Sequence, residues 1–393
     1  MKDRYDVIVV GGGPGGSWAA KHAAEGGASV LVLEKDREIG TPVRCAEGLS
    51  ELGLKRVVEV KDRWISQIIR GTRLVAPDGT VIESFAEGIG FVLNRKLFDY
   101  DLAAMASQAG ADVLTKAYVL GLCMEDGVVH GVEMIHMGQK HRISSSVVIG
   151  ADGVESRVGR WVGLETRISP EEMESCVQMT LTDIDIDPGV VEFYFGRQIA
   201  PGGYLWIFPK GSRTANVGLG ISGVYSRVKK PLFYLQEFVE RKFPGASVLT
   251  MVAGGVPTVP TLKEIVKDGL MLVGDAARQA NPMTGGGILC AMIAGKIAGG
   301  VAADAVRAGD VSAKRLGTYP REWHKAEGKN NERFYRLKTV VNRFSDEDFN
   351  RTARMLLSVP PEERTALQIF KKALFNHPKL ILEAAKVFSR GRA

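Results

Sequence analysis

Three glycines near the N-terminus have the spacing of a nucleotide-binding turn. Gly11, Gly13 and Gly16 follow an apolar run typical of a strand and begin an alanine-rich stretch typical of a helix. Bare backbone permits a tight turn whose amide groups approach a pyrophosphate, and the helix N-terminus stabilises the phosphate charge. Glu34 ends the next apolar run, where an acidic side chain can bind a ribose hydroxyl. These residues predict a dinucleotide-binding βαβ unit that holds NAD or FAD.

An acidic turn later in the sequence favours FAD over NAD as the bound dinucleotide. Gly274 and Asp275 end a short apolar strand, where the carboxylate can lie against a ribityl hydroxyl of a flavin. Gly286 and Gly287 then supply bare backbone at the start of a long helix. Asp152 ends another apolar strand and is a further candidate, although a turn followed by a capped helix explains it as well.

The elements that position these residues form two lobes. A βαβ pattern opens the chain, and the apolar strand before Gly274 indicates that the first lobe resumes late in the sequence. Between them, short strands and a Pro77–Thr80 turn indicate antiparallel hairpins. We therefore predict an α/β fold: a discontinuous, three-layer, Rossmann-like FAD-binding domain with a parallel sheet (residues 1–64, 95–165 and 256–318), an inserted antiparallel-sheet substrate-binding domain (65–94 and 166–255) and a C-terminal helical region (319–393).

Composition limits the class of protein. Hydrophobic residues make up 45% and charged residues 24% of the chain, which excludes disordered, collagen-like and disulfide-scaffold classes. The net charge of +6 favours anionic partners, but no long basic run with interleaved aromatics supports nucleic-acid binding. The 4 cysteines are widely spaced without a CxxC pair, so we expect no metal site, no secreted disulfide framework and a cytoplasmic location.

Two segments could be associated with a membrane. Residues 288–306 are apolar, but Lys296 and Asp304 interrupt them, so a core helix is expected rather than a membrane span. Residues 368–392 combine apolar and basic side chains. They are expected either to pack on the body of the protein or to rest on an anionic membrane surface, which would make the protein peripheral.

Several motifs together resemble a known superfamily. The N-terminal glycines, Asp152 and Asp275 occur in the order found in the para-hydroxybenzoate-hydroxylase-like flavoproteins. Within that superfamily, Pro42–Gly48 and Tyr204–Gly211 look like signatures of the geranylgeranyl reductases. The resemblance covers residues 1–320 and is strongest to the archaeal branch that saturates the isoprenoid chains of digeranylgeranylglycerophospholipids.

The resemblance implies further cofactor contacts. Gly15 would lie near the pyrophosphate, Arg95 near the phosphates or ribityl chain, and Val119 would contact the adenine side through its backbone. Without the resemblance, Arg95 is equally explained as a surface ion-pair residue. The flavin would be lined by Arg44, Cys45, Ala46 and Gly48, and its ribityl and ring end would be closed by Asp275, Gly287 and Ile288.

The implied reaction is the addition of a hydride and a proton across isolated C=C bonds of an isoprenoid chain. Cys45 is the candidate for proton delivery or positioning, against the alternative that it only packs. Cys290 follows the glycine turn and could approach Cys45 near the cofactor. The alternating Tyr204, Trp206 and Phe208 form either an ordinary core strand or the wall of a channel for an apolar chain.

Two other functions remain open from the sequence. One is an FAD-dependent monooxygenase or halogenase of the same fold, and the other is a non-catalytic flavoprotein that binds prenyl lipids. For a reductase, the expected partners are a long-chain isoprenoid lipid and an external electron donor. Ferredoxin, a deazaflavin and NAD(P)H all remain candidates for that donor, because the chain has no second GxGxxG domain.

Overall fold

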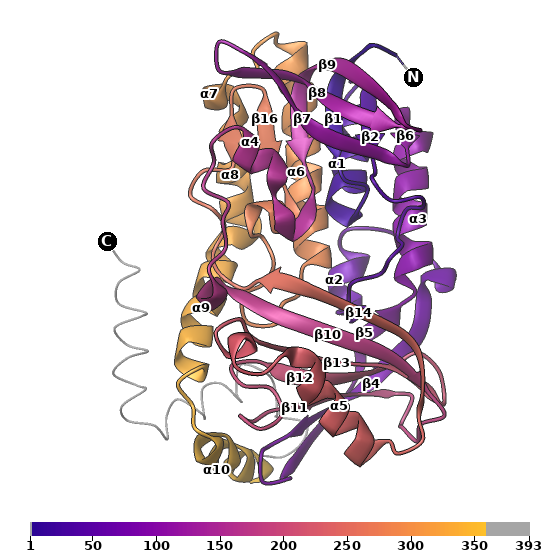
Figure 1. Ribbon diagram of the computed structural model, residues 1–393, viewed down its shortest axis with the longest axis vertical. Coiled ribbons are helices and arrows are strands. Elements are labelled where there is room, and N and C mark those ends of the chain that lie inside the picture. Colours follow the sequence, from indigo (N-terminus) through magenta and orange to yellow (C-terminus); the bar gives the residue numbers. More distant parts are fainter. Residues whose placement is uncertain (1, 359–393) are drawn as a thin grey trace. The chain divides into compact units, whose positions relative to one another are not determined.

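The computed structural model describes residues 2–358, which divide into two compact units (Figure 1). The predicted segment 368–392 lies outside these described residues. Of the described residues, the first unit comprises 2–43, 95–168 and 257–332, and the second comprises 44–94, 169–256 and 333–358.

The first unit contains an 8-stranded sheet with a parallel centre, in the order β15-β16-β9-β1-β2-β6, to which β7 and β8 attach through β9. Parallel pairing joins β16, β9, β1, β2 and β6, so the segments that follow β1, β2, β9 and β16 leave the same edge of the sheet. The strands are β1 (Arg4–Val10), β2 (Val30–Leu33), β6 (Ala111–Leu114), β7 (Ala117–Glu125), β8 (Val128–His136), β9 (Gln139–Gly150), β15 (Val266–Lys267) and β16 (Leu270–Leu272).

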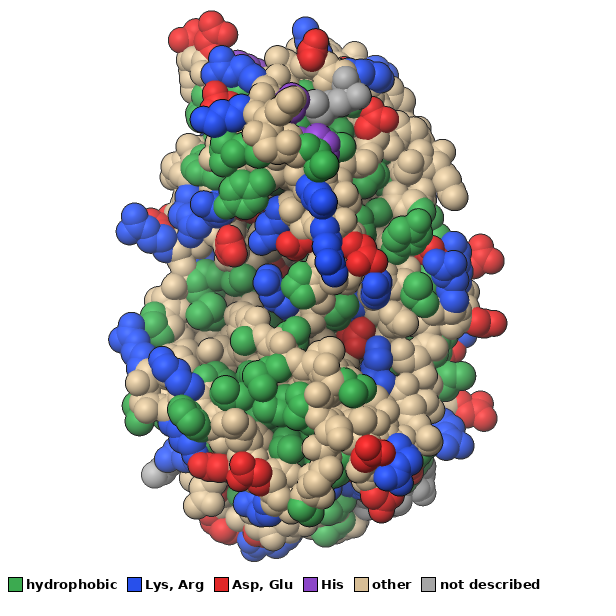
Figure 2. All heavy atoms as spheres, turned by 45° about the vertical axis from the view of Figure 1, so that its right-hand side comes forward, with side chains coloured by type: hydrophobic (Ala, Val, Ile, Leu, Met, Phe, Trp, Pro, Cys, Tyr) green, Lys and Arg blue, Asp and Glu red, His purple; other side chains and the backbone are tan. Residues whose placement is uncertain are grey.

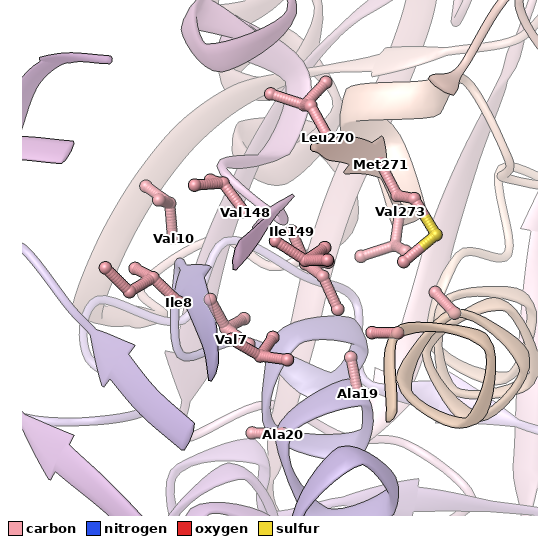
Figure 3. Packing of buried hydrophobic residues seen from close by; sticks show 14 of the residues in the cluster. Val7, Ile8, Val10, Ala19, Ala20, Val148, Ile149, Leu270, Met271 and Val273 are labelled. Atoms are coloured by element: carbon pink, nitrogen blue, oxygen red, sulfur yellow. The ribbon is translucent and has the colours of Figure 1, made fainter. Parts of the chain in front are cut away.

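Two small-residue helices pack closely in this unit. A Cβ atom added to Gly295 or Gly299 of α6 (Ile288–Arg307) would lie 2.3 or 2.2 Å from a backbone oxygen of α1 (Pro14–Glu25). Ala19 and Ala20 of α1 share an apolar cluster with side chains of β1, β9 and β16 (Figure 3). Within the described part of the chain, α6 alone is long and apolar enough to cross a membrane, yet its packing on α1 matches the predicted core helix.

The remaining helical elements of the first unit are short, apart from α3. Pro14 begins α1 at a position where its missing N–H costs nothing, and Gly13 is the N-cap. The other elements are α3 (Arg95–Gln108), η2 (Gly153–Glu155), α4 (Arg157–Trp161), η5 (Gly274–Ala277), α7 (Ala313–Leu316), α8 (Thr318–Trp323) and the π-helix η6 (His324–Gly328), with α9 (Lys329–Val341) continuing into the second unit.

The second unit contains another 8-stranded sheet, in the order β14-β10-β13-β12-β11-β4-β5-β3. Its pairs are antiparallel from β10 to β11 and from β4 to β3, as predicted for this domain, and β11 pairs with β4 in parallel. The strands are β3 (Gly48–Leu49), β4 (Ile65–Val75), β5 (Val81–Leu93), β10 (Met173–Thr182), β11 (Val190–Tyr194), β12 (Tyr204–Pro209), β13 (Thr214–Ser222) and β14 (Ser247–Pro257).

Helical elements of the second unit include one helix that covers the sheet. Leu235 and Phe238 of α5 (Pro231–Lys242) join an apolar cluster with Leu205 and Ile207 of β12. Neither α5 nor β14 is among the elements predicted from the sequence. The others are α2 (Glu51–Lys55), η1 (Asp62–Trp64), η3 (Pro170–Glu172), η4 (Tyr225–Arg227) and α10 (Asp346–Leu357).

The unit boundaries differ from the predicted ones at residues 44–64 and within the predicted C-terminal region, whose residues 333–358 group with the second unit. Residues 44–64 group with the second unit, because β3 pairs with β5 and α2 packs against β5. Residues 319–332 group with the first unit, where α8 packs against α6. Both differences arise from contacts between residues distant in sequence.

Candidate active site

The glycine turn after β1 has the backbone geometry that a bound pyrophosphate needs. Gly11 has φ +108°, and a Cβ there would lie 2.3 Å from the carbonyl oxygen of Ala151. A Cβ on Gly16 would lie 2.0 Å from the carbonyl oxygen of Gly11. At Gly13, by contrast, an added Cβ meets nothing within 4 Å, and no side chain caps α1. The first-turn N–H groups of α1 therefore border open space that suits an anion.

Glu34 lies beside this turn. Its Oε2 accepts a hydrogen bond of 2.8 Å from the backbone N–H of Gly12, and its Oε1 accepts one of 2.9 Å from the backbone N–H of Asp36. These bonds fix the carboxylate at the end of β2, next to the glycine turn. A ribose attached to a pyrophosphate at the N-terminus of α1 would meet an acceptor there.

Asp275 lies in η5, after β16, beside the start of α6. Its Oδ1 is 3.3 Å from the position of a Cβ added to Gly287, the N-cap of α6. Burial raises the pKa of Asp275 to about 6, while the nearby Arg95 guanidinium lowers it. Arg95 also makes two hydrogen bonds of 2.7 Å to Asp99. The predicted ribityl acid, the N-terminus of α6 and Arg95 therefore share one region of the first unit.

A buried amide supports the turn that carries Asp275. Gln279 accepts a hydrogen bond of 2.7 Å from the backbone N–H of Gly274 and donates one of 2.8 Å to the hydroxyl of Tyr319. Tyr319 in turn donates to the carbonyl oxygen of Leu272 at 2.8 Å. Each of the polar atoms in this series of hydrogen bonds thus has a partner. The series holds η5 in a fixed position at the end of β16.

Asp152 occupies the corresponding edge after β9. Its Oδ2 accepts a hydrogen bond of 3.0 Å from the backbone N–H of Val158, in the first turn of α4. Its Oδ1 is buried with no hydrogen-bond partner among the described residues. Burial raises the pKa of this carboxyl, because the charged form is poorly solvated. A group of a bound cofactor would supply the hydrogen bond that this buried oxygen lacks.

The other predicted cofactor residues of the first unit have simpler surroundings. Val119 is buried in β7, directly before a register shift in its pairing with β8. Gly286 donates its backbone N–H to Thr284 at 3.2 Å, and Ile288 is the buried first residue of α6. A Cβ on Gly15 would contact Ala291 of α6 at 3.2 Å, so this glycine also serves the packing of the two helices.

Cys45 lies in a loop of the second unit, and hydrogen bonds hold both its side chain and its backbone. Its Sγ accepts a hydrogen bond of 3.2 Å from the backbone N–H of Glu47. Its carbonyl oxygen accepts one of 3.0 Å from Nε2 of Gln178, and Gln178 accepts one of 3.0 Å from the indole N–H of Trp206. The neighbouring Arg44 is exposed. Residues 44–48, which we call the thiol loop, are therefore linked through Gln178 to the aromatic strand β12.

An ion pair makes a second link between these two segments. Glu47 is buried with φ +73°, and its Oε2 lies 2.7 Å from Nζ of Lys210 and 2.6 Å from Nδ2 of Asn216. Asn216 also donates to the carbonyl oxygen of Ala46 at 3.4 Å. Glu47 follows Cys45 closely and Lys210 follows β12, so the pair holds the thiol loop against the sheet. We call Glu47, Lys210 and Asn216 the Glu47 cluster.

The aromatic residues of β12 share one face of the sheet. Tyr204 and Trp206 have ring centroids 5.9 Å apart, and Phe193 packs edge-on against both Tyr204 and Phe208 at 5.5 Å. A Cβ on Gly48 would lie 2.4 Å from the ring of Phe208, so the thiol loop packs directly on this face. Whether the face lines a channel or is only core stays a prediction.

The opposite face of β12 packs into the core under α5, so the two faces have different environments. Burial raises the pKa values of Tyr204 and of the nearby Cys176 thiol, the latter to about 12, so both are neutral at neutral pH. An apolar surface with neutral polar groups suits an uncharged hydrocarbon chain.

Two protein-family models match the chain. The model for FAD-dependent oxidoreductases matches residues 6–209, and the model for the geranylgeranyl reductase catalytic domain matches residues 172–256. A digeranylgeranylglycerophospholipid reductase from Methanocella arvoryzae is 47% identical over 98% of this chain and 99% of its own length. The chain belongs to the geranylgeranyl reductase family of FAD-dependent oxidoreductases. A relative of the same name from Methanosarcina mazei is 45% identical over 100% of this chain and 98% of its own.

Solved structures agree with this family assignment. A geranylgeranyl bacteriochlorophyll reductase-like protein from Thermoplasma acidophilum superposes with a TM-score of 0.92 at 35% identity, covering 98% of this chain and 99% of that one. A flavin-dependent brominase superposes with a TM-score of 0.72 at 18% identity, covering 95% of this chain and 100% of the brominase, which shows a shared fold alone. The expectations of an α/β flavoprotein fold and of FAD as cofactor are confirmed.

The predicted site residues of this geranylgeranyl reductase family member are divided between the two units. None of the four cysteines forms a disulfide, and burial raises the pKa of the Cys290 thiol in the first unit to about 12. The first unit holds Gly11, Gly13, Gly15, Gly16, Glu34, Arg95, Val119, Asp152, Gly274, Asp275, Gly286, Gly287 and Ile288, and the second holds Arg44, Cys45, Ala46, Gly48, Tyr204, Trp206 and Phe208.

Sequence reasoning missed the residues that support these sites. Glu47 and Lys210 stand inside the two signature blocks, so an acid in one and a base in the other could have suggested an ion pair. Gln178, Asn216, Gln279 and Tyr319 give no comparable signal, because none of them belongs to a recognisable motif.

Proposed function

We propose that the protein saturates isolated C=C bonds in the geranylgeranyl chains of archaeal-type isoprenoid glycerophospholipids. The observation that carries most weight is the thiol loop bonded to the aromatic face of β12, because it joins a polar reactive group to an apolar surface within one unit. The full-length similarity to digeranylgeranylglycerophospholipid reductases supports the same substrate class.

The residues of the first unit fit FAD. The glycine turn and the N-terminus of α1 would hold the pyrophosphate, Glu34 a ribose and Asp275 the ribityl chain. When bound and reduced, FAD would supply a hydride, which is one proton together with two electrons. The chain's own task is then to bind the alkene, exclude water and provide a proton for the second carbon.

Cys45 is the proposed proton donor or positioning group. Its Sγ is held by the N–H of Glu47, and its loop contacts the aromatic face on which an apolar chain would rest. A proton leaving this thiol for the second carbon must be replaced from solvent before the next turnover. Tyr204, Trp206 and Phe208 would orient the isoprenoid chain by apolar contact rather than by charge.

The reaction can be tested without oxygen. The dithionite-reduced, FAD-loaded protein is mixed anaerobically with a geranylgeranyl lipid, flavin absorbance is followed, and the lipid is analysed by mass spectrometry. We expect flavin reoxidation coupled to a gain of two hydrogens for each saturated bond. A monooxygenase or halogenase would need oxygen for reoxidation, and a lipid carrier would bind without any change in the lipid.

Cys45→Ala tests the role of the thiol. We expect the variant to retain FAD and to lose most reductase activity, because the substitution removes the proposed proton donor and leaves the predicted FAD-binding residues of the first unit unchanged. Flavin occupancy is measured from absorbance, and Cys123→Ala serves as a control, because Cys123 is buried in β7 of the first unit. Unchanged turnover at full occupancy would remove Cys45 from the mechanism.

The electron donor, location and membrane contact are also proposals. An external ferredoxin, deazaflavin or NAD(P)H would reduce the flavin. Reduction of the oxidised protein by each donor in turn, followed by absorbance, identifies it. We propose a cytoplasmic protein that is peripheral at the membrane surface, since its proposed substrate is a membrane lipid.

A further inference from the structure

A short segment of the second unit exposes several large hydrophobic side chains. Hydrophobic side chains reach the surface in several places on the face drawn in Figure 2. In η4 and the start of α5, Val224 and Tyr225 are each 42% exposed, Phe233 is 54% exposed and Val228 is 88% exposed. Val228 has the highest exposure of the large hydrophobic residues described. Single exposed hydrophobics are ordinary, but a group of them marks a surface that is covered by something else.

Basic residues alternate with these apolar ones. Arg227, Lys229 and Lys230 lie within the same segment, and the sequence has no acidic residue between Ser222 and Gln236. Two acids from neighbouring positions do face the group. Glu171 lies close enough to interact with Arg227, and Glu237 pairs with Lys229 at 2.6 Å. Three cations against these two acids leave the segment with a positive balance.

The fold holds the segment in place. Pro231 begins α5 and is buried, and Leu235 and Phe238 anchor the helix in the core of the second unit. A Cβ added to Gly202 would lie 3.4 Å from the ring of Tyr225, so η4 also packs on the body of the unit. The exposed side chains therefore project from a supported turn and helix start.

We infer that residues 224–233, which we call the η4–α5 surface, dock on an anionic lipid bilayer. A bilayer interface offers hydrocarbon to Val228 and Phe233 and phosphate groups to Arg227, Lys229 and Lys230. A small anionic ligand would use the cations but leave the apolar side chains in water. The charge and the apolar side chains together thus select a lipid surface. The inference takes its biological reason from the proposed lipid substrate, and it assigns the contact to described residues rather than to the predicted segment 368–392.

Vesicle flotation of the full, FAD-loaded chain tests this surface. The vesicles contain saturated phosphatidylglycerol and phosphatidylcholine, or phosphatidylcholine alone, so they offer no bond to reduce and the readout does not depend on reductase activity. We expect flotation with the anionic vesicles and much weaker flotation with the neutral ones. Val228→Asp with Phe233→Asp should reduce binding by about tenfold or more, because it removes the inserted apolar area. Lys229→Glu with Lys230→Glu should reduce it by about tenfold.

Met137→Asp is the matched control. Met137 is 68% exposed in a β-turn of the first unit with φ +49°, a conformation that Asp tolerates, so one exposed apolar side chain that does not belong to the η4–α5 surface is replaced by an acid. Its flotation should equal that of the native chain. The inference is overturned if both double variants float like the native chain, or if the native chain fails to float. It is equally overturned if neutral vesicles bind as well, or if the double variants convert a vesicle-free dimer into monomers, which would make the surface a contact between copies.

Discussion

Removing the charge of Lys210 should loosen the loop that carries Cys45. Lys210 Nζ lies 2.7 Å from Glu47 Oε2 and also donates to the carbonyl oxygen of Leu93. Lys210→Met keeps the length of the side chain but leaves the buried Glu47 carboxylate with Asn216 as its remaining described partner in the Glu47 cluster. Glu47→Gln makes the reciprocal change and retains an oxygen for Asn216.

The size of the effect follows from the geometry. Two unit charges 2.7 Å apart attract by roughly 6 kcal/mol at an effective dielectric constant of about 20. Desolvation of both groups offsets much of this, but removing one partner leaves the other buried without its opposite charge. Such changes typically cost about 3–5 kcal/mol of folding free energy. We expect Lys210→Met to cost about 3 kcal/mol of folding free energy. Glu47→Gln should cost less, because the Lys210 ammonium that it leaves can bind solvent or the carbonyl oxygen of Leu93.

Two measurements address stability and position separately. Urea unfolding of the single and double variants gives a coupling free energy, which we expect to be about 2 kcal/mol. Alkylation of Cys45, measured as the difference in rate between each variant and the same variant with Cys45→Ser, reports on the loop itself. We expect faster alkylation in both single variants, at urea concentrations where the fold is intact. Arg142→Met is the control, because its ion pair with Glu133 is exposed in the first unit.

Two results would refute the reasoning. A coupling free energy below about 0.5 kcal/mol would mean that the ion pair contributes no more than a surface pair. Unchanged alkylation of Cys45 in variants that are clearly destabilised would mean that the Glu47 cluster supports the sheet without positioning the thiol.

Two other predictions concern the first unit. The pKa of Asp275 in the folded chain, about 6, lies above its ordinary value, so the FAD-free fold binds an extra proton between about pH 4 and 6 and should lose stability as the pH rises through that range. Asp275→Asn should flatten this dependence in thermal melts and weaken FAD binding, and a slope like that of the native chain would contradict the assignment. Gly299→Ala should lower the Tm by several degrees, because its Cβ would lie 2.2 Å from the carbonyl oxygen of Ala19. Gly300→Ala, with nothing within 4 Å, should leave the Tm unchanged or raise it, and equal effects of the two substitutions would exclude close packing of α1 on α6 as the cause.

The sequence by itself determined the local elements of the nucleotide-binding part. The alanine-rich stretch predicted as a helix after the glycine turn is α1, because proline at the first turn and an alanine-rich interior specify a helix without help from distant residues. Two tight turns ending in glycine, Asp126-Gly127 between β7 and β8 and Met137-Gly138 between β8 and β9, have the positive φ values that two-residue hairpin turns require. The family could also be identified from the sequence, since its signature blocks are short and contiguous.

The tertiary structure alone decided how distant segments meet. The parallel pairing of β11 with β4, and the grouping of residues 44–64 with the second sheet, depend on contacts across long stretches of chain that no local pattern encodes. The same holds for Gln178, which joins the thiol loop to Trp206, and for Gln279, which fixes the turn before Asp275. The local sequence around a single polar residue is the same whether its side chain is exposed or hydrogen-bonded in the core. Its partners come from segments that only the fold brings together, and not from its neighbours in sequence.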